Sequence, residues 1–235
     1  MTEKRFIAFD IETAPQPKEK LDLLVPDFKA PGNWKDADKI RDNILEQRAK
    51  WYAEAALSPF TGRVLIIGLL GYDGTRSFLE GEEKDILAQF WGIFDRLENA
   101  AMPFVFWSGR GAAEEMFDID FIVTRSRILG VEFNGIVRQR RYYTERIVDL
   151  TKELLLWHRD QYLKLTTAAE LFNLYDANPA LKRKLNDDLV KGENFHLWYT
   201  GQGAPMFTPQ QQRRMALDYL GNDLGLTAGI APHIL

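Results

Sequence analysis

The chain has 235 residues, a length that fits one α/β domain with an insertion or at most two small domains. Its content of 46% hydrophobic and 27% charged residues is typical of a globular protein. It contains no cysteine, and this excludes disulfides, thiolate metal sites and cysteine nucleophiles. The net charge of −4 argues against a broadly basic nucleic-acid surface, although local patches or metal ions can still hold phosphate. With no signal peptide and no apolar run that could span a bilayer, we expect a cytoplasmic protein without a membrane partner.

The first predicted element is a buried strand at residues 5–9, rich in aromatic and β-branched side chains. An insertion is predicted at residues 14–60, between the first two strands. It opens with an irregular stretch at 15–31, which four prolines interrupt. A helix is expected at 36–57, with Asp36 as its N-cap.

The elements after the insertion alternate between strands and helices. Strands are predicted at 62–70, 76–79, 103–107 and 145–149, and helices at 82–98, 114–129, 150–157, 166–173 and 209–230. A turn at 72–75 predicts a hairpin between the second and third strands, and we expect a mobile stretch before the last helix. This order predicts an α/β fold, a mixed sheet covered by helices, in a single domain over 1–235.

Two acids follow the first strand, Asp10 and Glu12. Because side chains alternate faces along a strand, both should point to the same side. Carboxylates held close together repel each other unless a cation lies between them, so the pair is a candidate site for a divalent metal ion. Taken alone, the D-x-E pattern of Asp10 and Glu12 also fits the solvent-exposed end of a strand.

Two further acidic motifs lie on predicted helices. Asp118 stands in an F-D-x-x-F pattern, beside the apolar face that Phe117 and Phe121 supply, and can reach inward. Tyr219 and Asp223, four residues apart, share one face of the last helix, where the hydroxyl can position a water beside a metal held by the carboxylate. A solvated acid in the first case, and a core tyrosine with a surface aspartate in the second, are the simpler interpretations.

The order of the three motifs resembles the DEDD (DnaQ-like) superfamily of 3′–5′ exonucleases. The tyrosine in the third motif is similar to the DEDDy branch, and the chain looks like the proofreading exonuclease domain of family-B DNA polymerases. The resemblance covers about 5–13, 63–79, 104–158 and 209–230. It implies a ribonuclease-H-like fold, in which helices flank a five-stranded mixed sheet.

The resemblance also implies the catalytic residues, which are Asp10, Glu12, Asp118, Tyr219 and Asp223. The four acids would hold two divalent metal ions, Mg²⁺ or Mn²⁺, and such ions typically lie about 3.5–4 Å apart. Tyr219 would orient the attacking water. In the histidine branch an imidazole stands five residues before the last acid, and here that position is Asp218, so this branch is excluded.

Four positions near the second motif bear on the resemblance. The family usually has a polar residue four or five positions before the motif acid, where this chain has Ala113 and Glu114. Asp120 could compete with Asp118, although only Asp118 is spaced correctly between the phenylalanines. Arg125 could contact a phosphate, but we expect it to pair with an acid.

The resemblance implies hydrolysis of the 3′ end of single-stranded DNA with release of nucleoside 5′-monophosphates. RNA is an alternative substrate, since the choice depends on contacts to the 2′-position. A non-catalytic nucleic-acid-binding module on the same fold is a third interpretation, although all four acids and the tyrosine are present. Association with replication or repair proteins would suit either enzyme. Trp107 and Phe117 could stack on bases, or could simply be core residues.

Overall fold

The computed structural model describes residues 5–96, 102–108, 117–133, 146–156, 161–182 and 189–235. The chain divides into two compact units, Met1–Glu12 with Val64–Leu235, and Thr13–Arg63. The second unit nearly coincides with the predicted insertion at 14–60, while a single domain over 1–235 stays a prediction. No helix in the described ranges is both long enough and apolar enough to cross a membrane.

Over the described residues, the strands form one five-stranded sheet in the order β3-β2-β1-β4-β5. Strands β1, β4 and β5 run parallel, whereas β2 and β3 are antiparallel, so the sheet is mixed. The strands are β1 (Ile7–Pro15), β2 (Gly62–Gly71), β3 (Arg76–Leu79), β4 (Phe104–Phe106) and β5 (Ile147–Asp149). The predicted hairpin is confirmed, because Gly74 takes a positive φ of 81° in the turn between β2 and β3.

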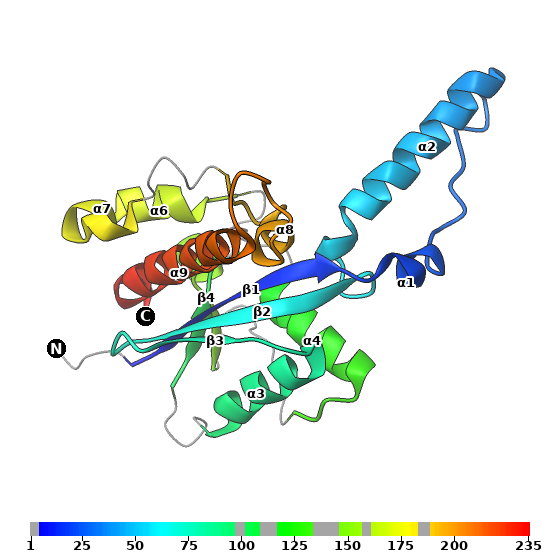
Figure 1. The fold of residues 1–235 in the computed structure, drawn as a ribbon. Helices are drawn as coiled ribbons and strands as arrows, with labels where there is room; N and C mark the ends of the chain where they lie inside the picture. Colours follow the sequence, from blue (N-terminus) through cyan, green and yellow to red (C-terminus); the bar gives the residue numbers. More distant parts are fainter. Residues whose placement is uncertain (1–4, 97–101, 109–116, 134–145, 157–160, 183–188) are drawn as a thin grey trace. The chain divides into compact units, whose positions relative to one another are not determined.

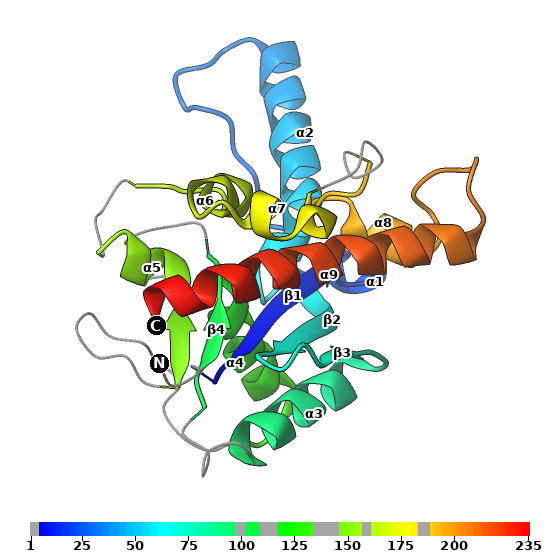
Figure 2. The ribbon, with the colours of Figure 1, turned by 90° about the vertical axis from the view of Figure 1, so that its left-hand side faces the viewer.

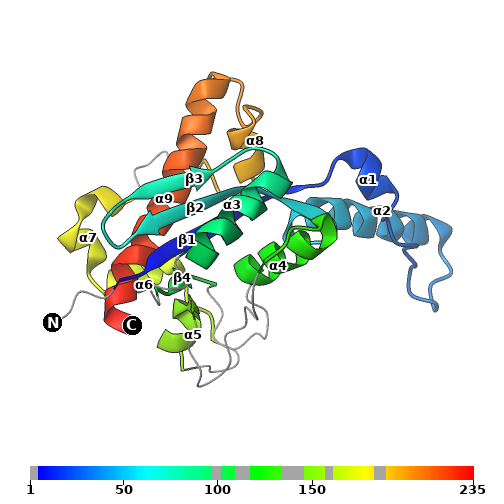
Figure 3. The same ribbon diagram turned by 90° about the horizontal axis from the view of Figure 1, so that it is seen from below.

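Helices lie on both faces of the sheet (Figures 1 and 3). The helices outside the second unit are α3 (Glu83–Arg96), α4 (Phe117–Leu129), α5 (Leu150–Leu154), α6 (Leu165–Leu171), α7 (Leu174–Ala177), α8 (Phe195–Tyr199) and α9 (Pro209–Ile234). Helices α3 and α4 cover one face, and α9 crosses the other, with α5, α6 and α8 packed against it (Figure 2). The main apolar core lies between the sheet and α3 and α4.

Helix α9 packs closely on the sheet because β2 has a glycine beneath it. A Cβ on Gly68 would lie 2.6 Å from the side chain of Leu224 and 3.1 Å from that of Leu220, so any side chain there would force these leucines out of their present positions. The helix starts with a capping box between Thr208 and Gln211, and Pro209 occupies its first turn. It runs to Ile234, four residues past the predicted end.

Two further differences from prediction concern short helices. The sequence predicts no helix between the one at 166–173 and the last one, yet the described part of this stretch contains α7, a 3₁₀ turn at Pro179–Leu181 and α8. Helices this short have weak sequence signals, and tertiary packing stabilises them instead. The helix predicted at 150–157 ends at Leu154.

A buried ion pair links α3, α4 and β2. Arg125 donates to both carboxylate oxygens of Glu83, at 2.8 and 2.7 Å, and the backbone N–H of Val64 also donates to Glu83, at 2.8 Å. The two side chains are only 6% and 11% exposed. The prediction that Arg125 pairs with an acid is confirmed.

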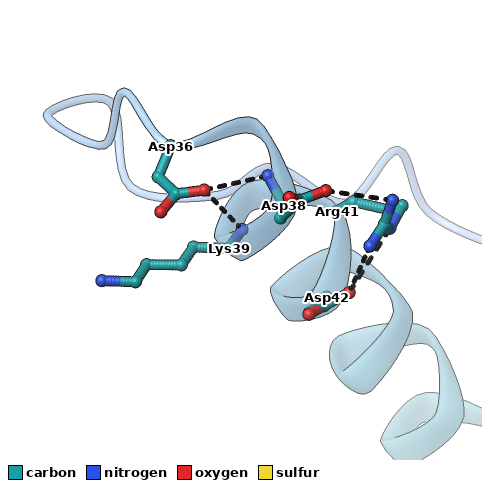
Figure 4. Close-up of polar contacts among 5 residues, drawn as sticks. All are labelled: Asp36, Asp38, Lys39, Arg41 and Asp42. Atoms are coloured by element: carbon teal, nitrogen blue, oxygen red, sulfur yellow. Dashed lines mark hydrogen bonds and ion pairs between the residues drawn. The ribbon is translucent and has the colours of Figure 1, made fainter.

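The second unit contains α1 (Lys18–Asp22), α2 (Ala37–Ala53) and a 3₁₀ turn at Ala55–Leu57. The predicted N-cap is confirmed, since Asp36 accepts hydrogen bonds from the backbone N–H groups of Asp38 and Lys39 at 3.0 and 3.2 Å (Figure 4). Arg41 lies one turn further along, between Asp38 and Asp42, and these ion pairs are exposed.

Removing this cap should weaken the start of α2. We expect Asp36→Ala to cost about 1 kcal/mol locally, because two helical N–H groups lose their acceptor. Hydrogen exchange of the Asp38 and Lys39 amides measures the effect. Asp42→Ala is the matched control, because it removes only an exposed ion pair, and it should leave these amides nearly unchanged. Equal exchange in both variants would contradict the capping role.

Candidate active site

A cavity of about 280 Å³ lies where the middle of β1 and the residues that follow β4 meet α6 and α9. Three of the predicted site residues line it, Asp10, Tyr219 and Asp223. The other lining residues are Trp107, Ser108, Tyr162, Lys164, Leu165, Thr166 and Thr227. Residues more than 200 positions apart in the sequence thus contribute to one cavity, in agreement with the predicted grouping of the first and third motifs.

Asp10 lies in the middle of β1, one residue after the core residue Phe9. It is half-buried, since it keeps some exposure to the cavity while protein atoms surround the rest of the carboxyl group. This burial raises the pKa of Asp10 well above its ordinary value, and the nearby charges of Asp118 and Asp223 raise it further. Three carboxylates from β1, α4 and α9 therefore lie close enough to interact.

Asp118 lies in the first turn of α4, and its side chain is buried. The sequence pattern had predicted that this side chain can reach inward. Burial is the main reason that the pKa of Asp118 rises to about 7, and the charge of Asp149 adds to the effect. A hydrogen bond from the backbone of Ile11 partly opposes the shift. This contact connects α4 directly to the strand that carries Asp10.

Asp149 is an acid of the site that the sequence analysis missed. It ends β5, caps α5 by accepting from Thr151 N–H at 3.0 Å, and lies 3.9 Å from the ammonium of Lys152. Both side chains are buried; burial raises the pKa of Asp149 and lowers that of Lys152. Asp149 is the last residue of an apolar strand that runs parallel to β4, and parallel neighbouring strands bring their carboxyl ends to the same edge. An acid at the end of a short apolar strand was therefore the sequence signal for Asp149.

Helix α9 positions the third motif. Leu220 and Leu224 face the sheet at Gly68, which places Tyr219 and Asp223 beside them, toward the cavity. Asp223 is buried and Tyr219 is half-buried. The spacing of four residues puts both on one face of the helix, and both line the cavity.

The remaining cavity wall combines aromatic, hydroxyl and cationic groups. The indole N–H of Trp107 donates to the backbone carbonyl of Leu163 at 3.1 Å, which holds the ring at the end of β4. Tyr162 is 65% exposed at the rim. Lys164 brings a positive charge to a described lining that is otherwise acidic or uncharged. Such a wall suits a ligand with a planar ring and a phosphate.

Two predicted site acids do not line the cavity. Glu12 and Asp118 are both buried, and neither belongs to the cavity wall. Asp118 nevertheless interacts with Asp10 electrostatically. Ala113 and Glu114, where the motif departs from the family pattern, lie outside the described residues.

The raised pKa of Asp118 predicts how stability depends on pH when no divalent cation is present. Well below pH 4 the Asp118 carboxyl group is protonated in both the folded and unfolded states, so it does not lower the free energy of unfolding. Between pH 4 and 7 the folded state binds the proton more tightly, so stability falls as pH rises, and above pH 7 the full cost is present.

Asp118→Asn should therefore be more stable than the wild type at about pH 8 in chelator, and close to it at about pH 4. Urea unfolding at the two pH values measures this difference. If the difference in unfolding free energy between Asp118→Asn and the wild type does not change with pH, the surroundings of Asp118 do not destabilise its charged form, and the prediction is wrong.

The donor set suits hard divalent cations, because it consists of carboxylate oxygens. Burial first, and then repulsion between the acids, raises the pKa values of Asp10 and Asp118, and a bound cation would relieve that repulsion. Among the described residues, however, no three carboxylate or imidazole side chains form a complete metal-binding cluster. The acids thus fit as ligands by chemistry and by mutual interaction, and their binding of cations belongs to the proposal below.

Comparisons with known proteins give one structural likeness. No family model matches the chain, and no curated protein sequence matches it. A solved structure of the family B DNA polymerase from the hyperthermophilic archaeon Pyrobaculum calidifontis matches 98% of this chain, with a TM-score of 0.58 and 17% sequence identity. This chain spans 24% of that polymerase chain. The predicted fold class is confirmed: over its described residues, the chain has the α/β fold of a polymerase segment, a five-stranded mixed sheet flanked by helices.

Proposed function

We propose that this protein is a metal-dependent 3′–5′ exonuclease that removes nucleoside 5′-monophosphates from single-stranded DNA. The observation that carries the proposal is the cavity in which Asp10, Tyr219 and Asp223 meet, with the charges of Asp118 and Asp223 acting on Asp10. Repelling carboxylates in a cavity are typical of sites that bind cations and phosphate oxygens. The likeness to a family B DNA polymerase supports a function connected with nucleic acid.

Asp10, Glu12, Asp118 and Asp223 would hold the two divalent ions, Mg²⁺ or Mn²⁺. Bound in such a pair, these ions supply an activated water and neutralise the charge on the leaving 3′-oxygen. Glu12 and Asp118 are buried and do not line the cavity, and a residue that holds an ion need not itself touch the substrate.

The protein itself would bind and orient the substrate. Lys164 is the cationic lining residue, and its ammonium group would pair with a phosphate oxygen. The indole of Trp107 and the exposed ring of Tyr162 offer faces on which a base can stack. The Tyr219 hydroxyl would hold the attacking water, since a phenol with an ordinary pKa near 10 is poorly matched to act as a base at neutral pH.

The proposal is tested by digestion of 5′-labelled single-stranded DNA and RNA in Mg²⁺, in Mn²⁺ and in EDTA. We expect a ladder that shortens from the 3′ end, release of nucleoside 5′-monophosphates and no cleavage in EDTA. Faster digestion of RNA would assign the protein to the exoribonucleases instead. Binding of both polymers without cleavage in either metal would identify a non-catalytic module and contradict the proposal.

Tyr219→Phe tests the tyrosine separately from the acids. It keeps the ring and removes only the hydroxyl, so we expect kcat to fall by about 10²-fold, the lower range for loss of one positioning group, with divalent-ion affinity nearly unchanged. Single-turnover digestion and Mn²⁺ titration measure the two effects. Loss of ion affinity in this variant would contradict the water-orienting role.

A further inference from the structure

The ring of Tyr219 has an aromatic neighbour on another helix. Phe195, the first residue of α8, lies with its ring centroid 6.3 Å from that of Tyr219, at an angle of 58°. Phe195 is completely buried, and its ring also stacks on that of Tyr199, with the centroids 5.7 Å apart. Ring pairs at these distances and angles stabilise each other beyond their buried area, so Phe195 restricts where the Tyr219 ring can lie.

The hydroxyl end of Tyr219 lies beside the chain segment that precedes α8. A Cβ built on Gly192 would lie 4.0 Å from the Tyr219 hydroxyl oxygen. Apart from Gly192 itself and its two neighbours in the chain, no other described residue would have an atom within that distance. An alanine there would make only ordinary van der Waals contact. A longer side chain would extend toward the hydroxyl group and crowd it.

The segment that carries Gly192 and Phe195 has hydrogen bonds within its first part and contacts to Glu80 and α9 at its end. Before α8, Lys191 N–H donates to the Asn194 side chain at 2.8 Å, and Asn194 donates to the Leu189 carbonyl at 3.0 Å. At the end of α8, Tyr199 donates to Glu80 at 2.6 Å. Arg213 of α9 pairs with the same carboxylate at 2.6 Å and lies 4.2 Å above the Tyr199 ring. Helix α8 is therefore tied to the helix that carries Tyr219.

We infer that Phe195 is a positioning residue for Tyr219 and that Gly192 keeps the space beside the hydroxyl open. This inference rests on the proposed function, in which Tyr219 orients the attacking water. Without the Phe195 ring, the phenol samples other side-chain conformations, and a displacement of about 1 Å at a reacting group can cost as much as 10²-fold in rate. Phe195 itself does not line the cavity.

The first test is Phe195→Leu, which keeps apolar volume and removes the ring. We expect kcat to fall by about tenfold while KM changes less than about twofold, because substrate binding does not involve Phe195. Trp198→Leu is the matched control: Trp198 is a buried aromatic residue of the same helix that packs on Phe207 and has no ring contact with Tyr219 in the described structure. An equal fall in kcat in both variants would show a general loss of packing and overturn the inference.

A double-mutant cycle separates this inference from the proposed function. In a Tyr219→Phe background, Phe195→Leu should have almost no further effect on kcat, because the hydroxyl that it positions is gone. Full additivity would overturn the positioning role even if the exonuclease is confirmed. An unchanged kcat in Tyr219→Phe alone would instead contradict the role of Tyr219 in the proposed function.

Two measurements complete the test. With 3-fluorotyrosine incorporated, the Tyr219 resonance, assigned by its loss in Tyr219→Phe, should broaden or shift toward the free amino acid in Phe195→Leu but not in Trp198→Leu. An unchanged resonance would overturn the inference, whatever the activity. For Gly192, kcat should be close to wild type in Gly192→Ala and lower in Gly192→Leu, and equal values in all three proteins would contradict the role assigned to the glycine.

Discussion

Asp10→Asn should lower the rate of 3′-end digestion by about 10³-fold or more at saturating Mg²⁺. The substitution keeps the size of the side chain and removes the charge on which Asp118 and Asp223 act. Activity then loses both cation affinity and stabilisation of the charge that develops on the phosphate, each of which is worth orders of magnitude in rate. Single-turnover kinetics with 5′-labelled DNA measure the loss.

Asp218→Asn is the matched control for Asp10→Asn. Asp218 lies on the same helix as Asp223, is 73% exposed and pairs loosely with Arg214, at 4.0 Å. Its rate should stay within about twofold of wild type, as for most exposed positions. Residual activity in Asp10→Asn comparable to that of Asp218→Asn would mean that the catalytic centre lies elsewhere.

Glu83→Ala should lower the free energy of unfolding by about 3–5 kcal/mol, the usual cost of removing one partner from a buried ion pair. The variant takes away both oxygens that accept from Arg125 and the acceptor of Val64 N–H, at the junction of α3, α4 and β2. Urea unfolding followed by tryptophan fluorescence measures the change.

The control for Glu83→Ala is Arg214→Ala, which breaks an ion pair whose side chains are 85% and 73% exposed. Exposed pairs contribute little, so the free energy of unfolding should change by less than about 0.5 kcal/mol. A loss in Glu83→Ala no larger than in the control would contradict the view that this ion pair holds the two helices on the sheet.

Local signals explain why most of the fold could be predicted. The apolar run of β2, the turn glycine Gly74 and the amphipathic pattern of α3 each act within about fifteen residues, so the pattern indicates the element directly. Asp36 and Pro209 mark helix starts in the same way. Helix α8 has no such signal: it is five residues long, no side chain caps it, and its buried aromatic residues pack against distant parts of the chain.

The same contrast between local sequence signals and packing of distant residues holds for the candidate site. Asp10, Asp118, Tyr219 and Asp223 could be selected because their spacing within each motif is local, and their order along the chain is distinctive. The meeting of Asp10, Tyr219 and Asp223 at one cavity, with Asp118 close to Asp10, depends on strand order and helix packing, which no local pattern contains. Asp149 and Lys164 were missed for this reason, since one acid after a short strand and one lysine before a helix are common everywhere.

The central claim is that the acids of β1, α4 and α9 form one site for divalent cations, and calorimetric titration with Mn²⁺ tests it most directly. We predict that the wild-type protein binds two equivalents of Mn²⁺ near neutral pH and releases protons as it does so, because the pKa of Asp118 is raised to about 7. Asp10→Asn and Asp118→Asn should each lose at least one equivalent, while Asp218→Asn should retain both. Wild-type binding that is absent, or that is unchanged in Asp10→Asn and Asp118→Asn, would contradict the account.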